Sequence, residues 1–345
     1  ARMKRFTMKL LSNVLPIVFS VIICGCDPSQ KMHTGRNYTG ELLGKKYEID
    51  IPDDTLNRTA LIDSVFTTFE QIFNSTNPHS LISEINSYHR NDTVFVLNDS
   101  ARLFGIVSDL ASDLCRKTVR SWDPASAPLR RNMLTAGNLG DVSDSLLEAC
   151  SFNELNIRMQ EHFDERGKYE STSLLKRNLL TELDFTDIAS ALAVDYLAEA
   201  FILHGIKSFK ISHDGDVKCH GLNGNPLGTI ELGIGSNKDN PKVDIGNTSF
   251  AMRDATDKQS MVDPETGYTS SGPIVYVAIA TPLLTEARIF SQAFIIKDLN
   301  SISNYYTQNP DSKIHSFIFF QQGDTLQNAS TSGFDNLIIS SNSVK

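Results

Sequence analysis

Apolar side chains recur along this chain at two spacings. In residues 56–74, 101–119 and 192–204 they recur every three or four positions, which predicts amphipathic helices. Short runs that are apolar, or that alternate with polar residues, predict strands at residues 42–51, 93–97, 208–212, 229–234, 274–280 and 316–320. Residues 130–182 are charged and show less pattern.

The order of these elements indicates the fold class. Helices and strands are mixed without a regular alternation, and no internal repeat is visible. We therefore expect an α+β fold, with mixed or antiparallel sheets and flanking helices, rather than a doubly wound parallel sheet.

The N-terminal segment has a different pattern. Basic residues precede an apolar run from Leu10 to Cys24, and no acid occurs before Asp27. The run is too short and too interrupted for a membrane-spanning helix, and it is typical of a secretory signal. It ends in Ile23-Cys24-Gly25-Cys26, which resembles a bacterial lipobox with Cys26 as the lipidated residue. The alternative is a plain signal peptide with incidental cysteines.

This interpretation divides the chain into three parts. Residues 1–25 are expected to be a lipoprotein signal peptide, 26–40 a polar tether and 41–340 the folded domain. The protein is then predicted to lie in the cell envelope, lipid-anchored to a bacterial membrane and facing the periplasm or the exterior.

Composition and charge limit the classes of partner that this protein is expected to bind. With 40% hydrophobic and 21% charged residues, the 345-residue chain can form a packed core. Removing residues 1–25 takes away four of the 32 basic residues and none of the 41 acidic ones, so the net charge changes from −9 to −13. Such an acidic balance argues against a nucleic-acid partner. Cys115, Cys150 and Cys219 form no C-x-x-C pair, so we expect buried thiols rather than a zinc site.

Six short patterns occur in an order that is known from one enzyme family. In the first, Gly40, Leu43, Gly44 and Tyr47 fit a Gly…Met-Gly-Thr-x-Tyr pattern, in which Lys45 replaces the Thr. The full set lies in residues 40–47, 73–86, 122–129, 183–195, 213–217 and 261–267. Together they resemble the periplasmic FAD:protein FMN transferases, long labelled ApbE-type thiamine-biosynthesis lipoproteins.

The resemblance implies a fold, a reaction and a set of binding residues. The fold would be ApbE-like and related to the T-fold, and the reaction would be Mg²⁺-dependent transfer of FMN from FAD to a Thr of an envelope partner protein. The implied flavin-nucleotide positions are Leu43, Trp122, Asp123, Asp184, Ser190 and Asp263. The implied metal positions are Asp187, Glu286 and Ser291, and no catalytic residue is assigned.

Several positions depart from the family pattern. Ala287 stands where the family has a metal-binding Asp, with Glu286 one residue out of register and Arg288 adding positive charge beside it. Ser190 replaces a family Lys, and Ser260 replaces a family His. The family segment A-T-S-G corresponds here to residues 251–254 and contains Arg253, while Asp214 replaces the first Gly of a G-G-D turn.

These departures leave two hypotheses open. The first is an FAD:protein FMN transferase with a remodelled metal site. The second is a non-catalytic envelope lipoprotein that keeps the fold for weak binding of a flavin or of a partner protein. Single residues also have two interpretations: Trp122 as a flavin-stacking or a core residue, Asp184 as a ligand contact or a helix N-terminal carboxylate, and Asp187 as a ligand or a solvated loop acid.

Overall fold

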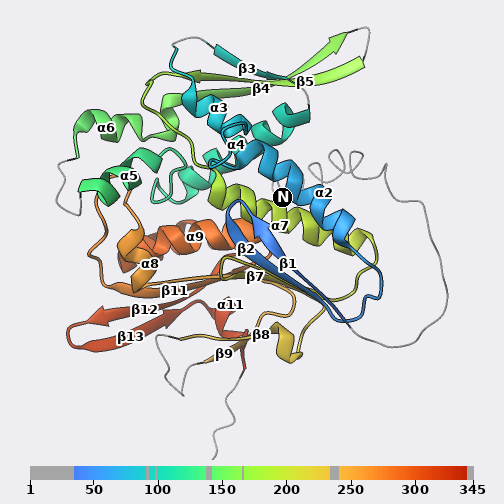
Figure 1. Cartoon of the computed structure of the whole chain (residues 1–345). Coiled ribbons are helices and arrows are strands. Elements are labelled where there is room, and N and C mark those ends of the chain that lie inside the picture. Colours follow the sequence, from blue (N-terminus) through green and yellow to red (C-terminus); the bar gives the residue numbers. More distant parts are fainter. Residues whose placement is uncertain are drawn as a thin grey trace, which may run out of the picture.

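A large antiparallel sheet forms the base of the molecule (Figure 1). The computed structural model describes residues 35–90, 93–97, 99–136, 142–164, 167–233 and 241–339, so Cys26 and the predicted signal lie outside it. The sheet has eight strands in the order β1-β2-β6-β7-β10-β11-β12-β13. Their bounds are Arg36–Leu42, Lys45–Ile51, Phe209–His213, Asp216–His220, Ser249–Asp254, Ile274–Thr281, His315–Gln322 and Thr325–Ser330.

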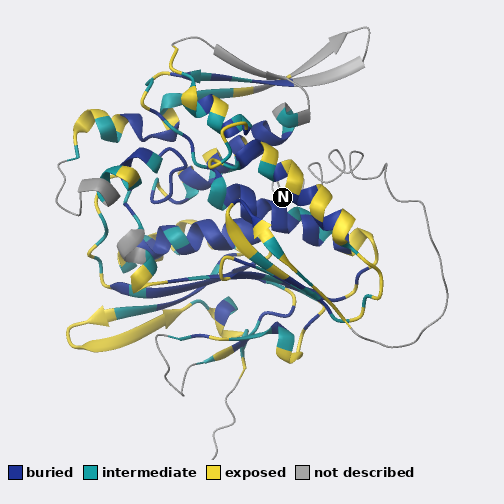
Figure 2. Ribbon diagram, in the orientation of Figure 1, coloured by how far each residue is buried: buried dark blue, intermediate teal, exposed yellow. Residues whose placement is uncertain are grey.

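Two buried helices cover one face of this sheet. Helix α9 (Leu284–Ile296) contacts β10 and β11, and α7 (Thr186–Leu203) packs on α9 and contacts β6 and β7. Twelve of the 13 residues of α9 and 12 of the 18 residues of α7 are buried (Figure 2), because protein surrounds most of both helices. A helix in such a position needs no polar face, which explains why α7 is mostly apolar after its first turn, with Ser190, Asp195 and Glu199 as the exceptions.

Further elements cover α7 on the side away from the sheet. Helix α2 (Thr59–Phe73) packs against α7, and α4 (Asp99–Lys117) lies between α7 and a three-stranded sheet of order β3-β5-β4. The bounds of that sheet are Thr93–Leu97 for β3, Leu155–Asp164 for β4 and Gly167–Lys176 for β5. The smaller helices are α3 (Leu81–Ser87), α5 (Ala127–Ala136), α6 (Asp144–Ala149), α8 (Ala255–Ser260) and α10 (Leu299–Gln308), of which α8 contacts β10, β11 and α9.

The opposite face of the large sheet carries a second, smaller core. It is covered by β8 (Thr229–Glu231), β9 (Lys242–Asp244), β14 (Ile338–Ile339) and the short helix α11 (Ser332–Asp335). Phe250, Tyr276 and Phe317 of the sheet pack there against Phe334. Both faces of the central strands are therefore buried, as expected for long apolar runs such as β11.

The α+β prediction is confirmed, as is the expectation of buried, unpaired thiols at Cys115, Cys150 and Cys219. Apart from the run 42–51, each predicted helix and strand is present, with ends shifted by up to six residues. Residues 130–182, which show little pattern, form α5, α6, β4 and β5. In the part of the chain that the structure describes, no helix has the length and apolar character to cross a membrane.

Two expectations near the start of the folded domain were wrong. Residues 36–40 were assigned to the tether, but they form most of strand β1, which pairs with β2. The run 42–51 is not one strand, because Leu43 and Gly44 have φ values of +50° and +76° and form a two-residue hairpin turn. As an edge strand, β1 exposes most of its side chains, so its sequence is polar like that of a linker.

Asp195 fixes the start of α9. This buried α7 side chain accepts hydrogen bonds from the backbone N–H groups of Leu284 (2.9 Å) and Thr285 (3.0 Å) and from the Thr285 hydroxyl (2.8 Å). Its carboxylate also pairs with Lys218 of β7 at 2.8 Å. Asp195 thus supplies from α7 the cap that α9 lacks at its own N-cap residue, and it ties α7, α9 and the sheet together.

We predict that Asp195→Ala lowers the free energy of unfolding by about 2–4 kcal/mol, because two N–H groups and Lys218 lose a buried partner. Asp298 is a matched control, since it caps α10 through the N–H of Ser301 (2.7 Å) at an exposed position. Asp298→Ala should cost only about 1 kcal/mol. Urea unfolding of the two variants measures both values, and equal losses would contradict the assignment.

Candidate functional site

A cavity of about 640 Å³ opens beside α9, which contributes Gln292 and Ile296 to its wall. Its walls come from the loop 121–126, the start of α7, the β6–β7 turn, strand β10 and the turn 261–264. Its volume falls in the range of small-molecule sites. Trp122, the only tryptophan of the chain, is on the wall and is 7% exposed.

The described wall of this cavity is polar and carries both signs of charge. Six carboxylates line it, from Asp123, Asp184, Asp187, Asp214, Asp254 and Asp257, together with the cationic side chains of Lys45, Arg130 and Arg253. Each of the three cations is paired with a carboxylate: Lys45 with Asp214 (3.4 Å), Arg130 with Asp184, and Arg253 with Asp216 (2.7 Å). The cations are therefore held in place at the wall.

Asp123 shapes the loop that carries Trp122. Its buried carboxylate accepts hydrogen bonds from the N–H groups of Ala125 (2.9 Å) and Phe152 (3.1 Å), and Arg120 lies at 3.2 Å. Burial raises the pKa of Asp123, and these bonds oppose that shift. Because its oxygens are used by the protein, Asp123 acts as a turn-forming residue that positions Trp122.

Asp184 lies where the chain enters α7. Its carboxylate accepts a hydrogen bond from the N–H of Thr186 (2.9 Å), as a helix N-terminal residue does, and it also pairs with Arg130 at the cavity wall. Both sequence interpretations of Asp184 are thus compatible with its position. Asp187, one helical turn further on, lines the cavity as well.

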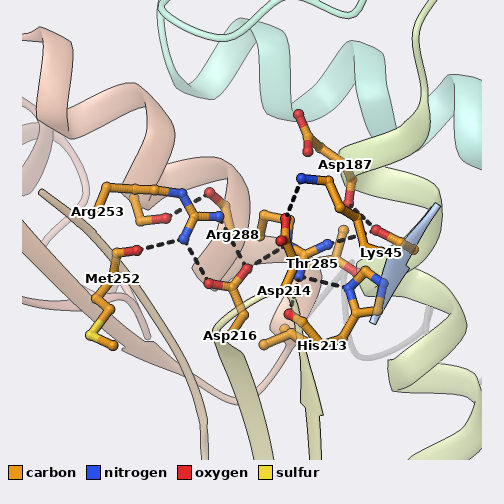
Figure 3. Close-up of polar contacts among 12 residues, drawn as sticks. Lys45, Asp187, His213, Asp214, Asp216, Met252, Arg253, Thr285 and Arg288 are labelled. Atoms are coloured by element: carbon orange, nitrogen blue, oxygen red, sulfur yellow. Dashed lines mark hydrogen bonds and ion pairs between the residues drawn. The ribbon is translucent and has the colours of Figure 1, made fainter. Parts of the chain in front are cut away.

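A cluster of buried charges lies behind this wall (Figure 3). Asp216, at the start of β7, is completely buried and binds two arginines. Arg253 of β10 donates to both of its carboxylate oxygens (2.7 and 3.1 Å), and Nε of Arg288 on α9 donates to one of them. Burial alone would raise the pKa of Asp216, but the two guanidinium groups hold it below its ordinary value.

Arg288 connects this cluster to α7 and β6. Its guanidinium donates to the Ser190 hydroxyl (2.6 Å), to the His213 carbonyl (2.8 Å) and to His213 Nδ1 (3.1 Å). Ser190 in turn donates to the carbonyl oxygen of Asp187 (3.3 Å). A fixed guanidinium therefore lies one hydroxyl group away from the backbone oxygen of Asp187, one of the metal positions that the family resemblance implies.

His213 is held in one neutral form. Its Nδ1 accepts from Arg288, so its Nε2 carries the proton and donates to the carbonyl of Leu42 at 3.1 Å. Burial and the neighbouring Arg288 lower the pKa of His213 to about 4. The ring is therefore neutral at physiological pH.

The structure does not bring the three predicted metal positions together. Asp187 lines the cavity, whereas the Ser291 hydroxyl donates to the Arg288 carbonyl of its own helix (2.8 Å). Glu286 lines a different cavity and accepts from the Thr281 hydroxyl at 3.2 Å. The reason is helical geometry, since residues five apart on α9 point about 140° away from each other.

The donor groups present therefore do not fit a bound divalent cation. Ala287 is buried and offers no ligand atom, and Arg288 brings a positive charge to the same place. Among the described residues, no group of three or more His, Cys, Asp or Glu side chains is arranged to hold a metal ion.

Of the predicted flavin-nucleotide positions, Trp122, Asp123 and Asp184 line the cavity. The other three are not on its wall. Leu43 is buried in the β1–β2 turn, where its N–H donates to Glu70. Ser190 is buried beneath Arg288, and Asp263 forms a turn by accepting from the N–H of Glu265 (2.9 Å).

Several wall residues were missed by the sequence analysis as binding candidates. Lys45 and Arg253 were noted only as departures from the family pattern, and Arg130 was not singled out. Asp216, which lies behind the wall, was not singled out either. No local signal marks them, because their roles depend on contacts between positions 37–169 residues apart, such as Arg253 with Asp216 and Lys45 with Asp214. Asp214 did carry a signal: it has a φ of +52° in a turn where the family pattern has Gly.

The low pKa of His213 predicts that the stability of the protein depends on pH. Its pKa is about 4 in the folded protein against 6.5 in the unfolded chain, so its contribution to stability is complete above pH 6.5 and is lost as the pH falls towards 4. We expect wild type to lose about 3 kcal/mol more than His213→Gln between about pH 7.5 and pH 4. Gln keeps one donor and one acceptor without titrating. Urea unfolding at several pH values tests this, and parallel pH profiles would contradict it.

Comparison with known proteins agrees with this fold. A sequence model described as the ApbE family matches residues 43–315. A search of curated proteins finds no match.

Solved structures of flavin transferases share the architecture. The flavin transferase ApbE from Vibrio cholerae is similar with a TM-score of 0.70 and 18% identity, over 88% of this chain and 99% of that one. The apo flavinyl transferase ApbE of Pseudomonas stutzeri gives 0.69 and 17%, over 88% and 96%. The ApbE protein of Thermotoga maritima gives 0.65 and 17%, over 88% and 99%. Because the family model spans most of the chain and the folds agree, this protein belongs to the ApbE family.

Proposed function

We propose that this protein binds the flavin nucleotide FAD in the cavity lined by Trp122. The observation that carries the proposal is the placement of an aromatic side chain with guanidinium groups: Trp122, although mostly buried in the main core, lines the cavity, and so do Arg130 and Arg253. An isoalloxazine or adenine ring and a phosphate group need these two kinds of contact. Membership of the ApbE family, and the likeness to solved flavin transferases, support this choice of ligand.

The reaction that we propose is transfer of FMN from FAD to a Thr hydroxyl of a partner protein. The Thr oxygen would form a bond to the FMN phosphorus, the pyrophosphate P–O bond would break, and AMP would leave while the hydroxyl proton passes to a base. Such a transfer depends on positioning and on stabilisation of the phosphate charge. At this wall, that charge would face the guanidinium groups of Arg130 and Arg253.

A second candidate function has its own supporting observation. Arg288 is buried with Asp216 beside the place where the family binds a metal, and Ser291 bonds to its own helix. This arrangement favours a non-catalytic protein that binds FAD or presents the fold to a partner. We further propose that Cys26 carries a lipid anchor to the cell envelope, which membrane fractionation of a Cys26→Ser chain would test.

We predict that Trp122→Leu weakens FAD binding at least tenfold, whereas Trp122→Phe keeps it within about threefold because an aromatic face remains. Isothermal titration calorimetry gives both affinities. Urea unfolding of the same variants separates a loss of ligand contact from a loss of core packing. Unchanged FAD affinity in a folded Trp122→Leu variant would show that the ligand lies elsewhere.

The two candidate functions differ in the fate of an acceptor. If the protein is a transferase, incubation with FAD, Mg²⁺ and a Thr-containing acceptor protein should increase the acceptor mass by one FMN group and release AMP. The same mixture with Thr→Ala in the acceptor is the control. FAD binding without any mass gain would support the non-catalytic function, and mass spectrometry distinguishes the two outcomes.

A further inference from the structure

The buried cluster consists of Arg253, Asp216 and Arg288. Of these three residues, Arg253 is the one that lines the cavity. It is 8% exposed, and its guanidinium is fixed by Asp216 and by the Met252 carbonyl (2.5 Å). These bonds use three of the five N–H groups of an arginine. Two N–H groups therefore have no acceptor within the described residues, in a side chain whose direction is already set.

Arg288 has a different role in the cluster. It is 1% exposed, does not line the cavity, and donates to Asp216, Ser190 and His213 through all three of its nitrogens. It is thus a buried, satisfied charge that acts on the cavity through Asp216 and through Ser190, which donates to the backbone of the wall residue Asp187. Arg253 presents donors, and Arg288 supplies positive charge behind it.

The charges of this cluster do not cancel. Two guanidinium groups share the single carboxylate of Asp216, and His213 is neutral. One positive charge therefore remains in a buried place, where an uncompensated charge is costly. The half-buried carboxylates of Asp187 and Asp257 act on Arg253 from the cavity wall and offset part of it. An anion that enters the cavity would add direct, charge-assisted hydrogen bonds.

We propose that Arg253 is the phosphate-binding residue of this cavity, and that the Arg253–Asp216–Arg288 cluster lets the cavity hold the phosphate of a flavin nucleotide without a divalent cation. The proposal rests on the flavin-binding function proposed above and extends it to the phosphate group. A guanidinium fixed in direction matches two phosphate oxygens at once, which a mobile lysine does not. Asp216 and Arg288 are positioning residues, since neither lines the cavity.

The test compares FMN with riboflavin, which differ by the phosphate alone. Calorimetry on the full chain in EDTA should show that FMN binds at least tenfold more tightly than riboflavin. Addition of Mg²⁺ should change the FMN affinity less than twofold. A requirement for Mg²⁺, or equal affinities for FMN and riboflavin, would overturn the proposal while leaving the flavin site intact.

Substitutions test whether Arg253 is responsible for the difference in affinity between FMN and riboflavin. Arg253→Met should bring FMN down to the affinity of riboflavin and leave riboflavin binding unchanged. Lys46→Met removes the same charge one position from the wall residue Lys45, at an exposed site outside the cavity, and should change FMN affinity less than twofold. If Arg253→Met does not fold, Arg253→Lys is used instead. It keeps the positive charge that pairs with Asp216 but not the planar guanidinium that can contact two phosphate oxygens, so FMN affinity should fall at least fivefold.

A separate probe distinguishes this inference from the flavin proposal. If neither FMN nor riboflavin binds, the flavin function fails, and inorganic pyrophosphate in EDTA is titrated instead. Pyrophosphate binding that is lost in the Arg253 variant supports the phosphate site by itself. Absence of pyrophosphate binding in the folded wild type overturns it.

Discussion

The arrangement around the cavity depends on one buried carboxylate. Asp216 is fully buried, and it joins Arg253 of β10 to Arg288 of α9 at the start of β7. A lone charge at this depth would destabilise the fold, so Asp216, Arg253 and Arg288 hold one another in position. Loss of Asp216 would leave two buried guanidinium groups without their shared carboxylate, at a cost of about 3–5 kcal/mol. The position of α9 over the sheet, and hence the floor of the cavity, follows from this contact.

A second polar contact fixes the N-terminus of the same helix, one turn before Arg288. Asp195 of α7 caps the first turn of α9 and pairs with Lys218 of β7. With α9 held at both places, its rotation is set, and this rotation directs Ser291 to its own helix and Glu286 to a separate cavity. The metal positions implied by the family resemblance are thus separated by the same contacts that stabilise the fold.

The departures from the family pattern are also physically paired. Ser190, where the family has a Lys on α7, accepts a hydrogen bond from Arg288 on the facing helix, so a cation lost from one helix is supplied by the other. Lys45, where the family has a Thr, forms an ion pair with Asp214, where the family has a Gly. These replacements alter the electrostatics of the site as a set, which argues against reading them as independent losses.

The sequence by itself determined the fold class, the main helices and strands, and the wall positions Trp122, Asp123 and Asp184, because periodicity and ordered short motifs are local signals. It did not determine the edge strand β1, whose solvated side chains resemble a linker, or the pairing of Arg253 and Arg288 with Asp216. From the sequence alone, Arg288 was only a positive charge beside the implied metal position. Only the tertiary structure decided that this charge is buried and shared, because the energy of a charge depends on the groups that surround it. Here these groups come from four other elements, β6, β7, β10 and α7.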